Sequence, residues 1–432
     1  MMRVAIIGGG WAGMAAAVAA AQAGHSVTVF EAARTLGGRA RGVTTPLPDG
    51  REVRLDNGQH ILIGAYTDSL RLMRSVGIAP EGALLRLPLA LTFPDGAGLA
   101  LPDWPAPWDA VAGILRARGW TWRDKLALLR TATTWQLRGF TCAPDATVAD
   151  LCAPLTRRLK DEFIAPLCVS ALNTLPSTAS GAVFLRVLKD AMFGPPGGSN
   201  LLLPRVDLGA LFPEAAAGWL AQRGHCVRMG QRVQRLQRSD VAPTPGGWRV
   251  NDEDFGRVLL ATSAPDAVKL IVEASAEATE QESGCLQAWA TTTGALRHEA
   301  ITTVYAMAAT SLPQPMLALR CDARHPAQFV FDRGQLGGPA GLLAFVISAS
   351  IGEREALQGA VVAQARAQLQ CTVQPVQTIT EKRATFACTP GLQRPPMQIA
   401  PNLLAAGDYI EGPYPATLEG AVRSGQAAGQ LP

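Results

Sequence analysis

The chain has 432 residues, of which 48% are hydrophobic, and its formal net charge is +4. This length is enough for two or three domains, or for two interleaved ones, and the apolar content is enough for large cores. The mild charge argues against a nucleic-acid-binding protein, because such proteins usually carry a concentrated basic face.

The start of the chain has the pattern of a dinucleotide-binding βαβ unit. An apolar strand over residues 3–7 leads into a G-x-G-x-x-G turn at Gly8, Gly10 and Gly13, a helix is predicted over residues 14–23, and a second strand ends on Glu31. Gly8 permits the tight turn, Gly10 lets a pyrophosphate approach the backbone, and Gly13 lets the helix pack close to the strand. The Glu31 carboxylate is placed to accept hydrogen bonds from a ribose 2′-hydroxyl, which favours FAD or NAD over NADP.

A signal peptide is the alternative interpretation of the alanine-rich run in this helix. It is disfavoured because three glycines stand where its apolar helix would have to begin. The next segment, residues 37–41, holds two glycines and two arginines and is predicted to be a second phosphate-directed element. After it, the apolar segments on either side of Asp56 are predicted to be strands joined by a tight turn at Asn57 and Gly58.

The middle of the chain differs in composition and periodicity from the segments before it. From about residue 66 to residue 193, prolines and tryptophans cluster and helical periods follow, which predicts a mostly helical insertion. Residues 201–204 return the chain to the nucleotide-binding part, a helix is predicted over residues 211–223, and further strands follow up to residue 262. A β-hairpin is predicted from residue 329 to residue 347, around a glycine-rich tip.

The end of the chain is the second strong signal. A buried strand ends on Gly407 and Asp408, and residues 414–425 form a loop that leads into a helix of small residues. Asp408 can accept hydrogen bonds from ribityl or ribose hydroxyls, and a helix N-terminus at Thr417 and Leu418 can stabilise negative charge on a reduced flavin. An ordinary strand–turn–helix is the alternative, but the N-terminal fingerprint needs a partner segment, so we expect the two chain ends to build one site.

These segments resemble the amine-oxidase and phytoene-desaturase type of FAD flavoprotein. Within it, residues 56–66, 165–174 and 414–422 are similar to the hydroxysqualene dehydroxylase family of bacterial hopanoid pathways. The resemblance implies an α/β fold: a Rossmann-type FAD-binding domain of the amine-oxidase type, interleaved with an α+β substrate domain. We predict that residues 1–70, 201–264 and 396–432 form the first domain, and residues 71–200 and 265–395 the second.

The resemblance also implies the residues that bind the FAD cofactor. The pyrophosphate and phosphates would meet Gly8, Gly10, Gly13, Gly38 and Arg39. The adenosine would meet Glu31 and the backbone of Val233, on the strand predicted after Gly230. The flavin end would meet Gly407, Asp408, Thr417 and Leu418.

The implied reaction removes the allylic hydroxyl of hydroxysqualene and replaces it with hydride from reduced FAD. A proton donor should help the hydroxyl to leave, and His60, Tyr66 and Tyr414 are the candidate catalytic residues. A structural histidine bonded to nearby backbone is the alternative for His60. Two other functions stay open: an oxidative desaturase of phytoene or another polyene, and a non-catalytic flavin-binding protein of a lipid pathway. No second nucleotide fingerprint is visible, so the electron donor is unidentified.

The predicted substrate is an apolar isoprenoid, and we expect the enzyme to collect it from a membrane surface. Tryptophans and basic residues alternate between residues 115 and 140: Arg116, Arg118, Trp120, Trp122, Arg123, Lys125, Arg130, Trp135 and Arg138. A solvated, core-packed pair of helices is the alternative. The eight cysteines form no C-x-x-C pair and the histidines show no metal-like spacing, so we predict no metal site and buried, reduced thiols. The expected location is cytoplasmic, peripheral on the inner face of the cytoplasmic membrane.

Overall fold

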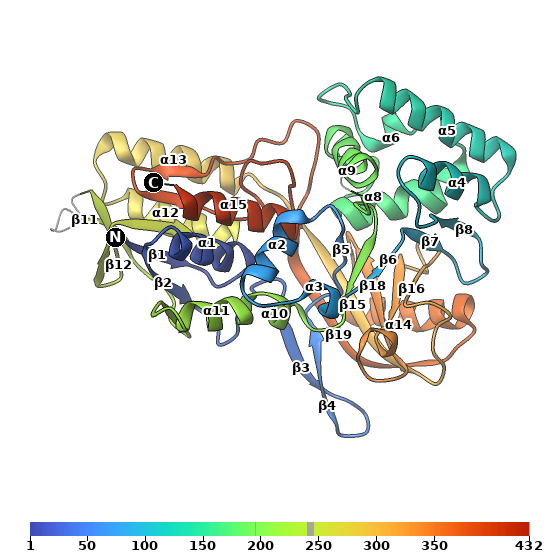
Figure 1. Ribbon diagram of the computed structural model, residues 1–432, viewed down its shortest axis with the longest axis horizontal. Coiled ribbons are helices and arrows are strands. Elements are labelled where there is room, and N and C mark those ends of the chain that lie inside the picture. The colour runs from blue at the N-terminus through green and yellow to red at the C-terminus, as the bar shows by residue number, and fades with distance from the viewer. Residues whose placement is uncertain (195, 240–245, 432) are drawn as a thin grey trace.

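The computed structural model describes residues 1–194, 196–239 and 246–431. The molecule is elongated, and its two halves lie side by side in Figure 1. The half at the left holds both chain ends and a mainly parallel sheet, and the half at the right holds an antiparallel sheet below a group of helices. The predicted α/β class is therefore confirmed, and the domain boundaries stay a prediction.

The nucleotide-binding half is built on a six-stranded sheet whose strands come from distant parts of the chain. The strand order is β10 (Cys226–Met229), β2 (Ser26–Glu31), β1 (Arg3–Ile7), β14 (Arg257–Leu260), β21 (Leu403–Ala405) and β20 (Gln398–Ala400). The first five strands run parallel, and β20 is antiparallel to β21. The first and last segments of the chain therefore meet in one sheet.

Helices cover both faces of this sheet. In β1, Val4 and Ile6 belong to the core on one face, and Ala5 and Ile7 to the core on the other. Successive side chains of a strand point to opposite faces, so a wholly apolar strand is typical of a sheet buried on both sides. The helices of the first face are α1 (Trp11–Gln22), α11 (Pro213–Ala221) and α15 (Leu418–Gln430), and those of the second are α12 (Ala264–Ser275) and α13 (Glu280–Gly294).

Small residues let α1 and α15, which cover the same face of the sheet, pack closely against each other. A Cβ added at Gly425 of α15 would stand 2.2 Å from the carbonyl oxygen of Ala12 in α1, and one added at Gly429 would stand 2.5 Å from that of Ala16. The alanine-rich sequence of α1 is thus explained by close helix packing. This contact fixes the N-terminus of α15 beside the N-terminal fingerprint.

The second half is built on a five-stranded antiparallel sheet. Its order is β16 (Met316–Ala318), β17 (Phe329–Asp332), β18 (Leu342–Ser348), β15 (His298–Ala308) and β19 (Val373–Phe386). The predicted hairpin is confirmed, because β17 and β18 pair, with a short 3₁₀ turn (Gly334–Leu336) at the tip. Helix α14 (Arg354–Gln364), which ends in a π-helical turn (Ala365–Leu369), packs against β19.

The helical insertion lies at the upper right in Figure 1. It contains α4 (Trp108–Arg116), α5 (Trp122–Leu137), α6 (Val148–Leu151), α7 (Arg157–Leu159), α8 (Ala165–Leu172) and α9 (Gly181–Phe193). A π-helical turn, Lys160–Ile164, joins α7 to α8, so residues 157–172 form one continuous helical segment.

Small sheets and short helices complete the chain. The sheets are β3 (Gly42–Pro46) with β4 (Glu52–Asp56); β5 (Leu62–Ile63), β9 (Leu201–Pro204) and β6 (Leu84–Leu87); β7 (Ala90–Thr92) with β8 (Gly98–Ala100); and β11 (Leu236–Ser239), β12 (Gly247–Val250) and β13 (Glu253–Phe255). The helices are α2 (Thr67–Ser75), α3 (Pro80–Ala83) and α10 (Leu208–Leu211).

Two predictions from local sequence are wrong. Asn57 and Gly58 do not close a hairpin: β4 pairs with β3 and β5 with β9, and the Asn57 side chain instead accepts a hydrogen bond from the backbone N–H of Arg41. Val233 is not on a strand but in the loop between β10 and β11, where its side chain is buried. In both cases a pairing partner distant in sequence decides where the strands end.

Burial also corrects two compositional predictions. Trp120 and Trp135 are core residues, 7% and 8% exposed, so they do not belong to the basic surface between residues 115 and 140. The eight cysteines are all free, but Cys226, Cys285 and Cys321 are exposed rather than buried.

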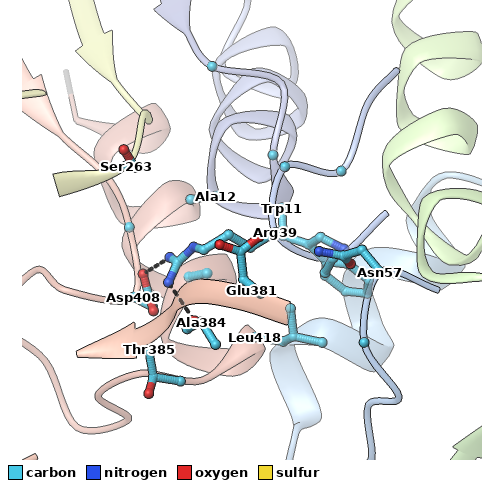
Figure 2. Close-up of a pocket in the computed structure, with 18 of the residues that line it drawn as sticks. Trp11, Ala12, Arg39, Asn57, Ser263, Glu381, Ala384, Thr385, Asp408 and Leu418 are labelled. Atoms are coloured by element: carbon cyan, nitrogen blue, oxygen red, sulfur yellow. Dashed lines mark hydrogen bonds and ion pairs between the residues drawn. The ribbon is translucent and has the colours of Figure 1, made fainter. Parts of the chain in front are cut away.

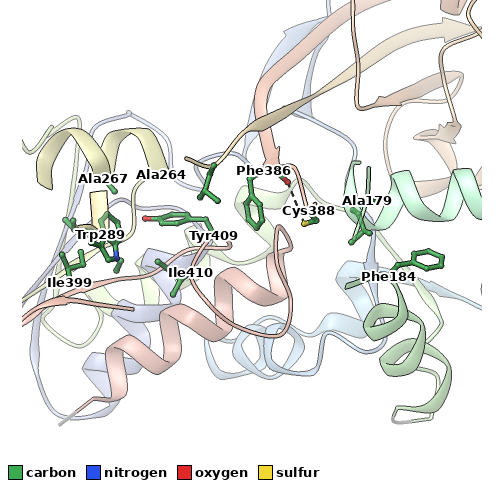
Figure 3. Close-up of a cluster of buried hydrophobic side chains, with 14 of the residues drawn as sticks. Ala179, Phe184, Ala264, Ala267, Trp289, Phe386, Cys388, Ile399, Tyr409 and Ile410 are labelled. Carbon is green, nitrogen blue, oxygen red and sulfur yellow. Dashed lines mark hydrogen bonds between the residues drawn. The ribbon is translucent and has the colours of Figure 1, made fainter. Parts of the chain in front are cut away.

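A continuous apolar core joins the two halves. Figure 3 shows it running from Trp289 and Tyr409 in the nucleotide-binding half, through Phe386, to Phe184 in the helical insertion. Within the described ranges, no helix is long and apolar enough to cross a bilayer.

Candidate active site

A cavity of about 810 Å³ lies between the two halves. One end is lined by the loops that follow β1, β2, β14 and β21, at the carboxyl edge of the parallel sheet. Ligands of open α/β sheets bind at this edge. The other end is lined by α8 and by strands of the antiparallel sheet.

Each of the three fingerprint positions is occupied by glycine for a different structural reason. Gly8 has a φ of +112°, and a Cβ there would stand 2.5 Å from the carbonyl oxygen of Ala261. A Cβ at Gly13 would stand 1.9 Å from the Gly8 oxygen, so this residue lets α1 pack on the turn, and it does not line the cavity. A Cβ at Gly10 would meet no atom closer than 3.9 Å, the Cα of Gly38. The backbones of Gly10 and Gly38 thus lie close together in the cavity wall, and neither carries a side chain.

Glu31 is held at the rim of this turn. One carboxylate oxygen accepts a hydrogen bond from the Gly9 N–H at 2.6 Å, and the other accepts one from the Ala33 N–H at 2.7 Å. The side chain therefore has a fixed orientation in the cavity wall, with lone pairs left for a hydroxyl donor. Val233 lines the same end of the cavity.

Arg39 and Asp408 join the first and last parts of the site. The Arg39 guanidinium is 2.5 Å from the Asp408 carboxylate and donates to the carbonyl oxygen of Ala384 at 2.8 Å. Figure 2 shows the arginine extended across the site toward Asp408, with Glu381 close by. Both partners line the cavity, as does Gly407. A contact between residues so far apart in the chain could not be read from the sequence.

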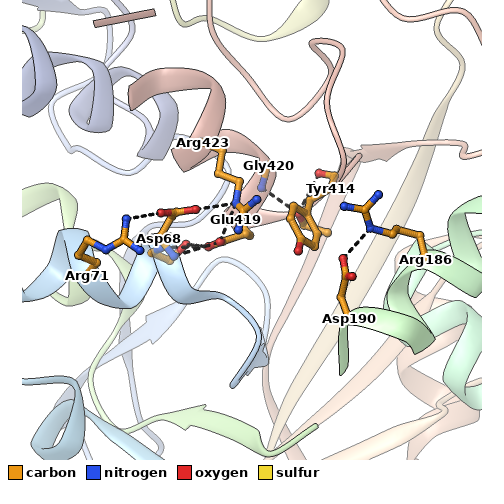
Figure 4. Close-up of polar contacts among 10 residues, drawn as sticks. Asp68, Arg71, Arg186, Asp190, Tyr414, Glu419, Gly420 and Arg423 are labelled. Carbon is orange, nitrogen blue, oxygen red and sulfur yellow. Dashed lines mark hydrogen bonds and ion pairs between the residues drawn. The ribbon is translucent and has the colours of Figure 1, made fainter. Parts of the chain in front are cut away.

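The N-terminus of α15 ends at the cavity. The Thr417 side chain caps the helix by accepting a hydrogen bond from the Gly420 N–H at 3.0 Å, and Thr417 and Leu418 line the cavity. The next residue, Glu419, is completely buried and accepts hydrogen bonds from the backbone of Asp68 and Ser69 at the start of α2. Figure 4 shows this carboxylate between α2 and Arg423. The helix N-terminus is therefore rigidly placed.

His60 lines the cavity where the two halves meet. Its Nδ1 is 2.6 Å from the carbonyl oxygen of Gly58, so Nδ1 carries the proton and donates it. Burial lowers the pKa of His60, which keeps the imidazole neutral at pH 7. Its Nε2 has no hydrogen-bond partner among the residues described, and is left as a free acceptor. The histidine is thus both bonded to backbone and exposed to the cavity.

The two tyrosines differ. Tyr66 lines the cavity, and burial, with the Glu419 carboxylate, raises the pKa of its phenol, which therefore stays protonated. Tyr414 does not line the cavity: its ring lies between Arg186 and Arg423, at 5.9 and 4.5 Å from its centroid (Figure 4). Its position indicates a role in joining α9 to α15.

The cavity wall also contains residues that sequence reasoning missed. At the nucleotide end these are Ser263 and Asp266, which open α12 after β14. The rule that ligands bind at the carboxyl edge of parallel strands could have found them. At the other end, Asn173 donates to Thr385 at 2.9 Å and accepts from the Ala349 N–H at 2.6 Å. No local signal marks that pairing.

The comparisons with known proteins agree with this geometry. A family model described as NAD(P)-binding Rossmann-like domain matches residues 6–76. The chain is 29% identical to hydroxysqualene dehydroxylase of Rhodopseudomonas palustris, covering 99% of this chain and 97% of the relative, and 27% identical to the protein of that name from Sinorhizobium fredii, with the same coverages. It is also 34% identical to 15-cis-phytoene desaturase of Synechococcus elongatus, but only over 29% of this chain and 27% of the relative.

Solved structures match over the whole chain. An oxidoreductase from Methanosarcina mazei superposes with a TM-score of 0.72 at 14% identity, covering 99% of both chains. Cyclohexylamine oxidase from Brevibacterium oxydans gives a TM-score of 0.67 at 17% identity, covering 99% of this chain and 98% of the other. The fold is that of these oxidoreductases. Together with the full-length relatives, it places the chain in the same broad class: an oxidoreductase with a dinucleotide site.

Proposed function

We propose that the chain is an FAD-dependent enzyme that removes the allylic hydroxyl of hydroxysqualene to give squalene. The observation that carries the proposal is similarity at 25–29% identity to three proteins named hydroxysqualene dehydroxylase, over 97–98% of their length. The far end of the cavity supports a long hydrocarbon substrate, because its lining is largely apolar: Ile61, Val169, Leu172, Ile301, Phe329, Phe331 and Val346.

The residues at the nucleotide end fit FAD. The bare backbone of Gly10 lets a pyrophosphate approach the cavity wall, the fixed Glu31 carboxylate suits a ribose, and the capped N-terminus of α15 favours negative charge at the flavin. Arg39, held by Asp408, adds a cation between these points. When bound and reduced, FAD would supply hydride.

The proposed reaction breaks the allylic C–O bond and forms a C–H bond at the same carbon. Hydride provides two electrons and one proton, and the hydroxyl leaves as water after it takes up a second proton. Since the His60 imidazole is neutral and its Nδ1–H is already donated, we assign it the role of accepting a hydrogen bond from the substrate hydroxyl. The protonated Tyr66 phenol is then the better placed of the candidate proton donors. The electron donor that reduces FAD stays unassigned.

The first experiment tests the cofactor site. A Cβ at Gly10 would meet no atom closer than 3.9 Å, so the Gly10→Val protein should fold and be purified without flavin. The matched control is Gly218→Val, on the exposed side of α11, where an added Cβ meets nothing within 4 Å and which lies outside the cavity. This control should remain yellow. A fully loaded, yellow Gly10→Val protein would refute the site.

The second experiment tests the reaction and its direction. Anaerobic enzyme with reduced FAD should convert hydroxysqualene to squalene, and oxidised enzyme should not desaturate phytoene. An oxidative desaturase, with the opposite direction of electron flow, is the second candidate. The chain is 34% identical to a phytoene desaturase, although only over 29% of its length. New double bonds in phytoene, with hydroxysqualene unchanged, would move the chain to that class.

A further inference from the structure

Large apolar side chains are exposed together at the outer end of the helical insertion. Five of them lie on α4, on α5 and on the loop before α4: Trp104, Trp108, Leu115, Trp122 and Leu126, which are 48, 66, 41, 72 and 47% exposed. We call this surface the α4–α5 patch. A contiguous apolar area on a protein surface usually marks an interaction site.

Contacts of two basic side chains connect three of these residues. The Arg116 guanidinium lies 4.9 Å from the centroid of the Trp104 ring. The Lys125 ammonium lies 5.2 Å from the centroid of the Trp122 ring and donates to the carbonyl oxygen of Leu115 at 2.7 Å. Residues seven apart in α4 and four apart in α5 share a helix face, which places Trp108 on the same face as Leu115, two turns away, and Trp122 beside Leu126.

The patch is strongly basic. Five cations lie between residues 102 and 130: Arg116, Arg118, Arg123, Lys125 and Arg130. Of the three acids in the same stretch, Asp109 and Asp124 are buried, at 6% and 5% exposure, and only Asp103 is exposed. Asp124 is occupied in the capping box of α5 and accepts a hydrogen bond from Thr156. The exposed charge of the patch is therefore almost entirely positive.

A single helical segment connects the patch to the cavity. Thr156, which bonds to Asp124 below the patch, starts the segment of residues 157–172, and the last residues of α8 line the apolar end of the cavity. Sixteen helical residues span about 24 Å. The patch therefore lies at the end of the molecule that carries the apolar part of the cavity, away from the chain termini (Figure 1).

We propose that the α4–α5 patch docks on the surface of an anionic lipid bilayer. Tryptophan and leucine side chains suit the boundary between headgroups and acyl chains, and arginine and lysine suit the lipid phosphates around them. The positive charge favours a bilayer over a second copy of the chain, whose patch would carry the same charge. The inference depends on the surface alone and not on the proposed reaction.

Vesicle flotation of the flavin-loaded full chain tests the proposal. The protein should float with phosphatidylglycerol vesicles and much less with phosphatidylcholine vesicles. Changing Arg116, Arg118 and Arg123 together to Glu should lower partitioning on the anionic vesicles at least about 100-fold. Changing Trp104, Trp108 and Trp122 together to Ala should also lower it on both vesicle types.

The matched control changes three exposed arginines near and on α14 to Glu: Arg324, Arg354 and Arg366. It removes the same charge elsewhere and should keep most of the binding. Far-ultraviolet circular dichroism and flavin content should be unchanged in all variants, since every altered side chain is exposed. Equal losses in patch and control variants, or no flotation of the wild type, would overturn the proposal. So would dimerisation that depends on the patch without vesicle binding. Squalene formation from detergent-dispersed substrate is measured separately, so a failure of docking and a failure of the proposed function are distinguishable.

Discussion

Asp56 is a buried acid whose titration should leave a measurable signature on folding. It is 1% exposed, its Oδ1 accepts a hydrogen bond from the Leu208 N–H at 2.7 Å, and its Oδ2 has no partner in the part of the chain that the structure describes. Burial raises the pKa of Asp56 to about 7, against the opposing effects of the Leu208 N–H, Arg333 and Arg54 and with a smaller addition from Asp207.

The sign of the effect follows from the two pKa values. An aspartate in an unfolded chain has a pKa near ~3.9, so between about pH 4 and pH 7 the native state holds a proton that the unfolded state has lost. The free energy of unfolding therefore falls as pH rises through this window, and the loss is complete above it. About three pH units at about 1.4 kcal/mol each give a total loss of about 4 kcal/mol from this group.

Asp56→Asn removes the titration and keeps an oxygen acceptor for the Leu208 N–H. Urea unfolding of wild type and variant should be compared from pH 4 to pH 8, because taking the difference cancels every other titrating group. The variant should gain about 4 kcal/mol on the wild type across this range, whatever constant cost the amide brings. Asp150→Asn is the control that should stay nearly parallel to the wild type over this range, because the Thr147 hydrogen bonds lower the pKa of that exposed carboxyl and its contribution to stability changes only below about pH 4. Parallel curves for wild type and Asp56→Asn would refute the reasoning.

Three other predictions concern the site. Gly13→Ala should lower the melting temperature strongly, because its Cβ would stand 1.9 Å from the Gly8 oxygen, whereas Gly10→Ala should fold like the wild type. Equal melting temperatures of the two variants in calorimetry would contradict the roles of the two glycines. Glu419→Gln should cost about 2–5 kcal/mol in urea unfolding, because it breaks the buried pair with Arg423 and points an amide donor at backbone N–H groups, and a loss below about 0.5 kcal/mol would contradict this. Turnover of hydroxysqualene should fall only below pH 6.5, where protonation of His60 removes the acceptor, and the pH profile of His60→Gln should lack that acidic limb.

Much of the fold follows from local sequence. The strand, glycine turn and helix at the start of the chain, the buried strand before Asp408 and the β17–β18 hairpin are set by apolar runs, glycines and alternation within short local segments. The same local patterns place Gly10, Glu31 and the N-terminus of α15 at strand or helix ends. Ends of parallel elements meet at one edge of a sheet, so these residues of the site could be predicted.

The sequence by itself thus determined the nucleotide end of the site, whereas tertiary structure decided which side chains meet. Arg39 and Asp408 are 369 positions apart, and only the pairing of β14 with β1 and β21 brings them together. The basic helices show the same limit, since Trp122 is exposed and Trp135 is buried although both lie on α5. Periodicity defines the faces of a helix, but the neighbouring elements decide which face is covered.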